Sequence, residues 1–368
     1  MVSAKASQQK RLFISDCEGP ISKNDNAYEL SEHFIPKGDS FFALISKYDD
    51  VQADVVKRSG YKAGDTLRLI LPFLKAYRVT NEKMKKFSME HILLVRGAKD
   101  TLRFVNNLMP SFIVSTSYEQ YIQALCSWVD FPCENVYCTA LNLDRYQISK
   151  KEGERLRQLR EEITAMNLIE IPDCAVSVND FSERDKKIIR RLDDIFWQEI
   201  SEMESDRMLK EVNPVGGVEK ARAIEDIVDR TSGRLSNVMY VGDSITDVQA
   251  FQLVRQNSGL TVSFNGNSYA VREAEVAVLS KNTTVTSVLA DVFSKFDKSQ
   301  VVKLVEEWSY SALKRYRVTP ALRNRMIKLY PEAFPQVEMI TSENKERLIK
   351  QSSAFRKIVR GEAMGRLG

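Results

Sequence analysis

Residues 12–20, LFISDCEGP, hold the strongest indication of how this chain folds. The stretch begins with a short uncharged run, which predicts a buried strand, and turns at once into an acidic loop with a glycine. Similar runs recur along the chain, and the last of them is the weakest: Phe112–Ser115, Val238–Val241, Leu260–Phe264 and Val276–Leu279. Helical patterns cover 221–228 and 246–255. Strand, loop and helix in repetition predict a parallel sheet covered by helices.

We therefore expect an α/β fold, with a doubly wound, Rossmann-like parallel sheet as its core. The long segments between the strands carry helical periodicity and exceed the length of one crossover, so they read as helical insertions. The predicted units are a core of 1–22, 109–149 and 213–297, a first helical insertion of 23–108, a second of 150–212 and a helical extension of 298–368.

Composition limits the class of protein. The 368 residues are 43% hydrophobic and 28% charged, which excludes a disordered chain. No apolar run reaches 18 residues and the polar start shows no secretory signal, so we expect a cytoplasmic protein without membrane insertion. The cysteines are odd in number and none forms a Cys-x-x-Cys pair, which disfavours a disulfide framework or a zinc finger: Cys17, Cys126, Cys133, Cys138 and Cys174.

Charge is unevenly distributed along the chain. The segment from Lys298 to the end holds 15 Lys and Arg against 7 Asp and Glu, whereas the preceding residues hold 39 against 43. A basic extension on an acidic body is compatible with an acidic protein partner, a membrane surface, RNA, docking on its own body or solubility alone. We expect no nucleic acid and keep the acidic partner as an alternative.

Acidic side chains follow two of the predicted strands. Asp16 and Glu18 come after the first, and Asp243 and Asp247 after the strand at 238–241. One Asp after a strand is more often a helix cap than a catalyst, but loops at the carboxyl ends of parallel strands converge on one crevice. Four carboxylates together need a cation, and Mg²⁺ is the one that oxygen ligands favour.

A hydroxyl and a lysine complete the predicted site. Ser115 ends the second strand, and Lys220 opens the helix after a Gly-Gly turn. Phosphoryl transfer needs positioning and neutralised charge above all, and these groups supply both. Thr116 is the alternative hydroxyl.

Together these positions resemble the motifs of the haloacid dehalogenase superfamily of phosphohydrolases. Those motifs are Asp-x-Asp after strand one, Ser or Thr after strand two, a Lys, and Gly-Asp-x-x-x-Asp, and all occur here in order with Glu18 as the one substitution. The first insertion is similar to the C1 cap of the phosphoserine phosphatase branch. More narrowly, 15–22 and 24–30 resemble an archaeal group named energy-converting hydrogenase A subunit R.

The resemblance implies a role for each residue. It makes Asp16 the nucleophile that forms an aspartyl-phosphate, and Glu18 the acid and base. It implies that Ser115 hydrogen-bonds the phosphoryl oxygens and that Lys220 neutralises their charge. For Mg²⁺ it implies Asp16, the backbone carbonyl of Glu18, and Asp243, with Asp247 as ligand or orienter.

Two positions depart from the family pattern. Glu18 is one methylene longer than the usual Asp, and Pro20 removes a backbone donor and stiffens the loop. In the cap, Arg58, Lys62 and Arg68 are candidates for contacting an acidic group of the substrate.

The prediction is a Mg²⁺-dependent hydrolase of a small phosphomonoester, because a cap of this size would roof the crevice. Two alternatives stay open. One is a non-catalytic or regulatory protein that uses this fold for docking, beside a hydrogenase for instance. The other is phosphotransfer to an alcohol acceptor, which needs the same residues.

Overall fold

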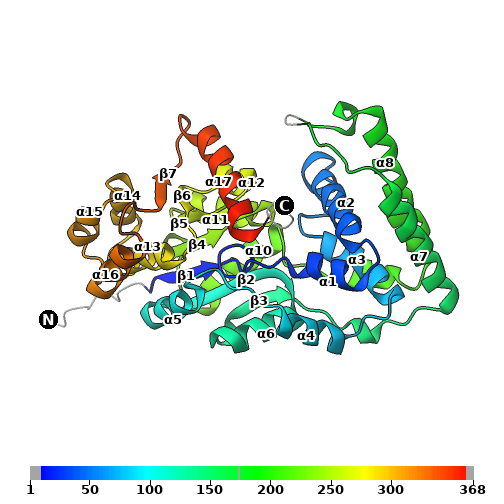
Figure 1. Cartoon of the computed structure of the whole chain (residues 1–368), viewed down its shortest axis with the longest axis horizontal. Helices are drawn as coiled ribbons and strands as arrows, with labels where there is room; N and C mark the ends of the chain where they lie inside the picture. The colour runs from blue at the N-terminus through cyan, green and yellow to red at the C-terminus, as the bar shows by residue number, and fades with distance from the viewer. Residues whose placement is uncertain (1–9, 173–174, 362–368) are drawn as a thin grey trace.

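A seven-stranded sheet forms the centre of the computed structural model, which describes residues 10–172 and 175–361 (Figure 1). The strand order is β3-β2-β1-β4-β5-β6-β7, and every neighbouring pair is parallel except β6 and β7. The strands are β1 Leu12–Ser15, β2 Ser111–Tyr118, β3 Val136–Thr139, β4 Val238–Gly242, β5 Leu260–Phe264, β6 Val276–Leu279 and β7 Gln336–Met339. The predicted α/β fold with a parallel core sheet is confirmed.

Helices cover both faces of the sheet because its central strands are apolar on both sides. Phe13 of β1 packs in one cluster with α5, α13, α14, α15 and α16, whereas Leu12 and Ile14 pack on the opposite face with α10 and α11. These helices are α5 Ala98–Leu108, α10 Val218–Arg230, α11 Val248–Gln256, α13 Thr284–Lys295, α14 Lys298–Glu306, α15 Tyr310–Arg315 and α16 Pro320–Leu329. Helix α6, Glu119–Val129, packs beside β2 and β3, with Cys17 and Cys126 buried in its cluster.

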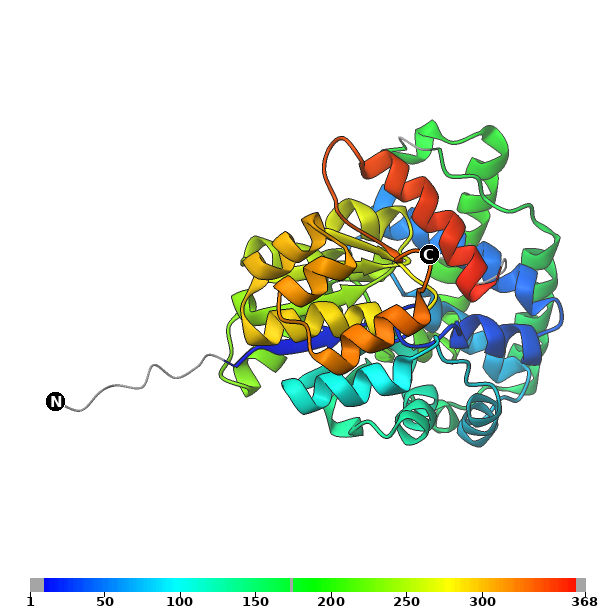
Figure 2. The same cartoon turned by 60° about the vertical axis from the view of Figure 1, so that its left-hand side comes forward.

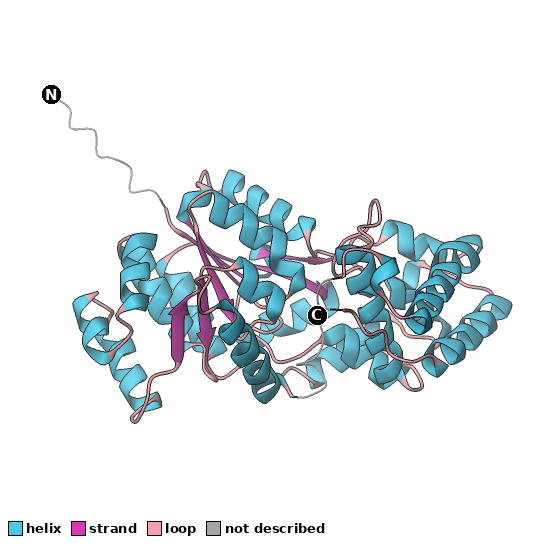
Figure 3. Cartoon of the chain, turned by 90° about the horizontal axis from the view of Figure 1, so that it is seen from above, coloured by secondary structure: helices cyan, strands magenta, loops and turns pink. Residues whose placement is uncertain are grey.

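A helical body lies at one end of the sheet, to the right in Figures 1 and 3. Both predicted insertions build it, and their apolar side chains share one buried cluster. From the first come α1 Asn26–Phe34, α2 Gly38–Asp50, α3 Thr66–Ala76 and α4 Asn81–Glu90; from the second come α7 Lys150–Ala165, α8 Glu183–Asp194 and α9 Asp206–Glu211. The division into units stays a prediction, and the shared cluster is what the structure adds to it.

The basic extension folds back on the core. After α14, α15 and α16 it supplies β7, which pairs antiparallel with β6 and was not predicted from the sequence. Its last helix, α17 Lys345–Arg360, crosses the carboxyl end of the sheet beside α12 Ser268–Glu273 (Figure 2). The extension is therefore part of the folded body.

The described residues bear on the predictions about the cysteines and about membrane insertion. Cys174 lies outside the described residues, and the other four cysteines are free thiols. Over the described ranges, none of the helices combines the length and apolarity needed to cross a membrane.

Candidate active site

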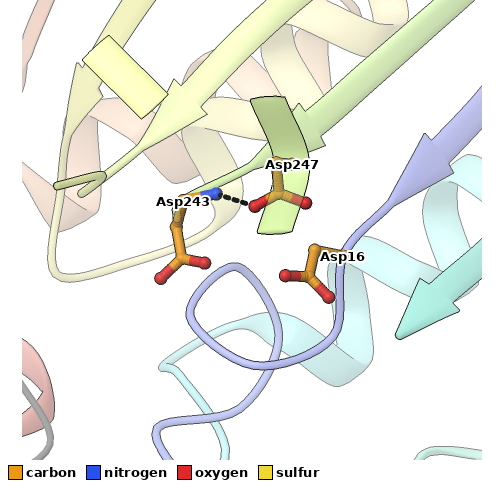
Figure 4. Close-up of side chains that lie close together, drawn as sticks. All are labelled: Asp16, Asp243 and Asp247. Atoms are coloured by element: carbon orange, nitrogen blue, oxygen red, sulfur yellow. Dashed lines mark hydrogen bonds between the residues drawn. The ribbon is translucent and has the colours of Figure 1, made fainter. Parts of the chain in front are cut away.

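Three buried aspartates meet where β1 and β4 end, as Figure 4 shows. Asp16 follows β1 directly, and Asp243 and Asp247 lie in the loop after β4. A carboxylate oxygen of each lies within 4.8 Å of one from both others, and all three side chains are buried. The adjacent parallel pairing of β1 and β4 brings them together. The acidic positions at these two strand ends thus converge, except for Glu18.

Lys220 supplies the positive charge inside this cluster. Its Nζ lies 2.8 Å from Asp16 Oδ2 and 2.7 Å from Asp247 Oδ1, and the side chain is fully buried at the start of α10. Burial raises the pKa of Asp16 well above its usual value, and Lys220 opposes that rise. Although burial alone would raise the pKa of Asp247, Lys220 and several hydrogen bonds bring it below the usual value.

Hydrogen bonds fix Asp247 in its loop. Its Oδ2 accepts from the backbone N–H of Asp243 at 2.8 Å and of Ser244 at 2.9 Å, and its Oδ1 accepts from the Tyr240 hydroxyl at 2.6 Å. A carboxylate with this many donors is held in one orientation. Asp16 has a similar support, because its Oδ1 accepts from the Cys17 N–H at 2.7 Å.

Glu18 is not part of the cluster formed by the three aspartates. Its Oε1 accepts from the backbone N–H of Asn26 at 2.7 Å, at the start of α1. Burial, with Asp25 nearby, raises the pKa of Glu18 to about 8. The carboxyl is therefore protonated at neutral pH, as a proton donor must be. The side chain still lines the same pocket as Asp16.

The two candidate hydroxyls after β2 face different surroundings. Ser115 is fully buried, and its Oγ accepts from the Ser117 N–H at 3.2 Å. Thr116 lines the pocket, and its Oγ1 donates to the Val215 carbonyl at 3.1 Å. Successive residues of a strand face opposite sides, so only one of the two can face the cavity directly. The role predicted for Ser115 stays a prediction.

The donor set of the cluster fits a divalent cation. Asp16, Asp243 and Asp247 offer oxygens alone, and oxygen ligands are what Mg²⁺ sites present. In this structure Lys220 pairs with Asp16 and Asp247, and Arg356 and Arg360 contact Asp243, so a bound cation would share these carboxylates with three basic side chains. Gly19, at φ +103°, lets the β1 loop pass so close to Asp243 that a Cβ there would overlap its carboxylate.

A pocket of about 90 Å³, partly open to solvent, lies between the aspartates and the helical body. Asp16, Glu18 and Asp243 line its floor, and Phe42, Ser46, Asp49, Asp50 and Leu67 line the side formed by α2 and α3. The helical body and the strand ends approach each other closely at Gly64, because a Cβ added to this residue would lie only 2.9 Å from Thr116 Cγ2.

The basic residues predicted for the cap lie elsewhere. Arg58 pairs with Asp193 at 2.9 Å, Lys62 donates to Asn213 at 2.5 Å, and Arg68 donates to the Leu209 carbonyl at 3.0 Å. None of the three is among the residues that line the pocket. Arg58 and Arg68 connect the two insertions, and Lys62 connects the first insertion to Asn213 of the predicted core.

Two arginines that the sequence reading missed line the pocket instead. Arg356 and Arg360 of α17 are buried, and both contact the Asp243 carboxylate. Their signal was present in the sequence: Leu348, Ser352, Arg356 and Arg360 recur every four residues and so share a helix face, and all four are buried.

Part of this chain matches the model of a known protein family. The model of a family described as haloacid dehalogenase-like hydrolase matches residues 97–291, more than half of the chain. The chain belongs to this hydrolase family. The matched range contains β2, β4, Lys220 and both aspartates after β4, while Asp16 precedes it and joins the site through the sheet.

One solved structure shares the fold of this chain over nearly its whole length. The gene product AF1437 from Archaeoglobus fulgidus is 24% identical with a TM-score of 0.79, and the alignment covers 98% of this chain and 99% of that one. An intermediate analogue of a phosphoserine phosphatase is 14% identical with a TM-score of 0.43, covering 77% and 98%. No curated protein matches.

Proposed function

We propose that this hydrolase cleaves a small phosphomonoester through a phosphorylated Asp16, with Mg²⁺ bound at the aspartate cluster. The observation that carries the proposal is the convergence of Asp16, Lys220, Asp243 and Asp247 in one buried cluster that opens onto a pocket. Membership in a hydrolase family supports it independently.

The chain's own residues supply both steps. A carboxylate oxygen of Asp16 attacks phosphorus, the bond from phosphorus to the ester oxygen breaks, and Glu18 protonates the departing alkoxide. Water then attacks phosphorus while the ionised Glu18 accepts its proton, which releases phosphate and restores Asp16. Lys220 neutralises charge beside Asp16, and Asp247 holds Lys220 in place.

Asp16 and Asp243 would hold the cation, with Asp247 as ligand or orienter. When bound, Mg²⁺ supplies positive charge for the phosphoryl oxygens and relieves the repulsion among the carboxylates. The carboxylates within 4.8 Å of one another support this assignment.

The test is phosphate release from a panel of phosphomonoesters, with and without Mg²⁺. We expect turnover that requires Mg²⁺ and disappears in Asp16→Asn. Asp229→Asn, at an exposed position of α10, is the matched control and should keep full turnover. An Asp16→Asn variant as active as the wild type would refute the mechanism. Adding an alcohol acceptor and looking for its phosphate ester separates hydrolysis from phosphotransfer.

A further inference from the structure

Helix α17 brings positive charge to the aspartate cluster from the far end of the chain. Arg356 Nη1 donates to the Asp243 carboxylate and, at 3.2 Å, to the Asp243 backbone carbonyl. Arg360 Nη1 lies 3.4 Å from Asp243 Oδ2. Both arginines are buried, as is Lys220, which pairs with the other two aspartates. In formal charge, three basic side chains therefore match the three carboxylates of the cluster.

The Arg360 guanidinium also binds the point where the chain leaves the core for the first insertion. Its Nε donates to the Lys23 carbonyl at 3.1 Å, and its Nη2 donates to the Asn24 carbonyl. The returning chain is bound to the same two residues. The Lys23 N–H donates to the Leu93 carbonyl at 2.7 Å, and the Leu93 N–H donates to Asn24 Oδ1 at 2.8 Å. One side chain thus links Asp243 to the outgoing crossing, and through it to the returning one.

The last two turns of α17, residues 353–360, are attached through contacts that its beginning lacks. Leu348 packs against apolar side chains of α12 and β6, and Ser352 Oγ donates to the Gly266 carbonyl at 2.6 Å. The last two turns add the ion pairs with Asp243. Apolar packing does not depend on the charge state of the site, whereas these ion pairs do. The last two turns can therefore loosen while the beginning of the helix stays docked.

We propose that these two turns form an autoinhibitory latch, in which Arg356 and Arg360 compete with the divalent cation for Asp243. This inference rests on the cation site of the proposed function and adds its regulation. A carboxylate that accepts from two guanidinium groups is a poor ligand for a cation, because their positive charges repel it at short range. To accept a cation, Asp243 has to release the arginines, which also loosens the crossing of the first insertion.

Competition of this kind acts in both directions. Removing one arginine should strengthen the binding of the cation, and the cation should weaken the attachment of the last two turns of α17. A purely positioning role gives the opposite sign. If the arginines only orient Asp243 for the cation, their removal weakens cation binding, so the direction of the change decides between the two roles.

Calorimetry on the full chain measures the affinity for Mg²⁺ without substrate or turnover. One charge-assisted contact corresponds to about 10- to 100-fold in affinity, so Arg356→Gln and Arg360→Gln should each bind Mg²⁺ that much more tightly than the wild type. Arg347→Gln is the matched control, since Arg347 lies on the same helix, is 46% exposed and pairs with Glu338. Its affinity should equal that of the wild type. Melting temperatures confirm that each variant folds.

Hydrogen exchange tests the other direction in the wild type and needs no variant. At matched ionic strength, saturating Mg²⁺ should speed exchange of the backbone amides in 353–360 roughly tenfold relative to EDTA, and those in 345–351 less than about twofold. In Asp243→Asn the arginines lose the charge that they bind. The amides of 353–360 should then exchange fast both with and without Mg²⁺.

Each outcome has a distinct meaning. Weaker or unchanged Mg²⁺ binding in either arginine variant would overturn the latch, and so would amides in 353–360 that Mg²⁺ protects or leaves unchanged. Mg²⁺ binding that appears only in the arginine variants supports it. Absence of binding in the wild type and in every variant would refute the cation site and the latch together. Absence of phosphate release from the wild type and the arginine variants, with the affinity pattern intact, would refute only the proposed hydrolysis.

Discussion

Replacing Lys220 by Met should destabilise the protein strongly when no divalent cation is present. The lysine Nζ lies 2.8 Å from Asp16 and 2.7 Å from Asp247, and all three side chains are buried. At an effective dielectric constant of about 20, each contact corresponds to roughly 6 kcal/mol of Coulomb attraction. Much of this is offset by the desolvation of the lysine itself, so we expect a net loss of about 3–5 kcal/mol in the free energy of unfolding.

The assay is urea unfolding followed by circular dichroism in buffer with EDTA, then with saturating Mg²⁺. Without Lys220 the aspartates repel one another, so a bound cation should restore part of the loss. Arg222→Gln is the control, because Arg222 lies two residues along the same helix with its side chain 69% exposed, and we expect a change below about 0.5 kcal/mol.

A double substitution tests the cause. In an Asp16→Asn background, Lys220→Met should cost about 1–3 kcal/mol less than in the wild type, because one of the two carboxylates no longer needs the lysine. A loss below about 1 kcal/mol for the single variant, or losses that simply add in the double variant, would refute the reasoning from these ion pairs.

Three further changes probe the walls of the site. Burial raises the pKa of Asp49 from 3.8 to about 7, so its ionisation lowers the free energy of unfolding as pH rises from about 4 to 7. Asp49→Asn removes this effect, so it should be more stabilising at pH 8 than at pH 4 by about 1–3 kcal/mol, measured by urea unfolding at both values. Gly19→Ala would place a Cβ onto Asp243, so Mg²⁺ affinity by calorimetry should fall at least about tenfold, and an unchanged affinity would show that the loop has room. Leu348→Ala, at a fully buried position of α17, should cost about 2–5 kcal/mol and speed proteolysis within α17, whereas protection equal to the wild type would contradict this packing.

The sequence predicted the inner strands because their burial leaves a readable pattern. Strands β1, β5 and β6 begin and end where the uncharged runs do, since both faces of a central strand must be apolar. The outer strands lack this signal. In β7 only Val337 is buried, between Gln336 and Glu338. In β3 the apolar run is only three residues long, Val136–Cys138, and all three residues are half-exposed.

The strand ends and Lys220 of the candidate site were predictable from the sequence, but the orientation of the side chains there was not. Position after a strand places Asp16 and Asp243 at one edge, because parallel strands end together. Spacing along a strand does not decide which of Ser115 and Thr116 faces the pocket, since a shift of one residue reverses the side. The arginines of α17 required knowledge of where a helix at the other end of the chain docks.

That docking also changes how the uneven charge of the chain should be tested. The basic extension uses its cations on the acidic body: Lys298 pairs with Glu275 at 2.6 Å, Arg325 with Asp100 at 2.7 Å, and Arg356 with Asp243. Deleting it would remove β7 and expose Asp243 without its counter-charge, so lost function would not distinguish a docking tail from an enzyme. Exposed substitutions such as Arg347→Gln, which leave the pocket intact, can make that distinction: loss of a partner with unchanged turnover would place the partner on the outer face of α17.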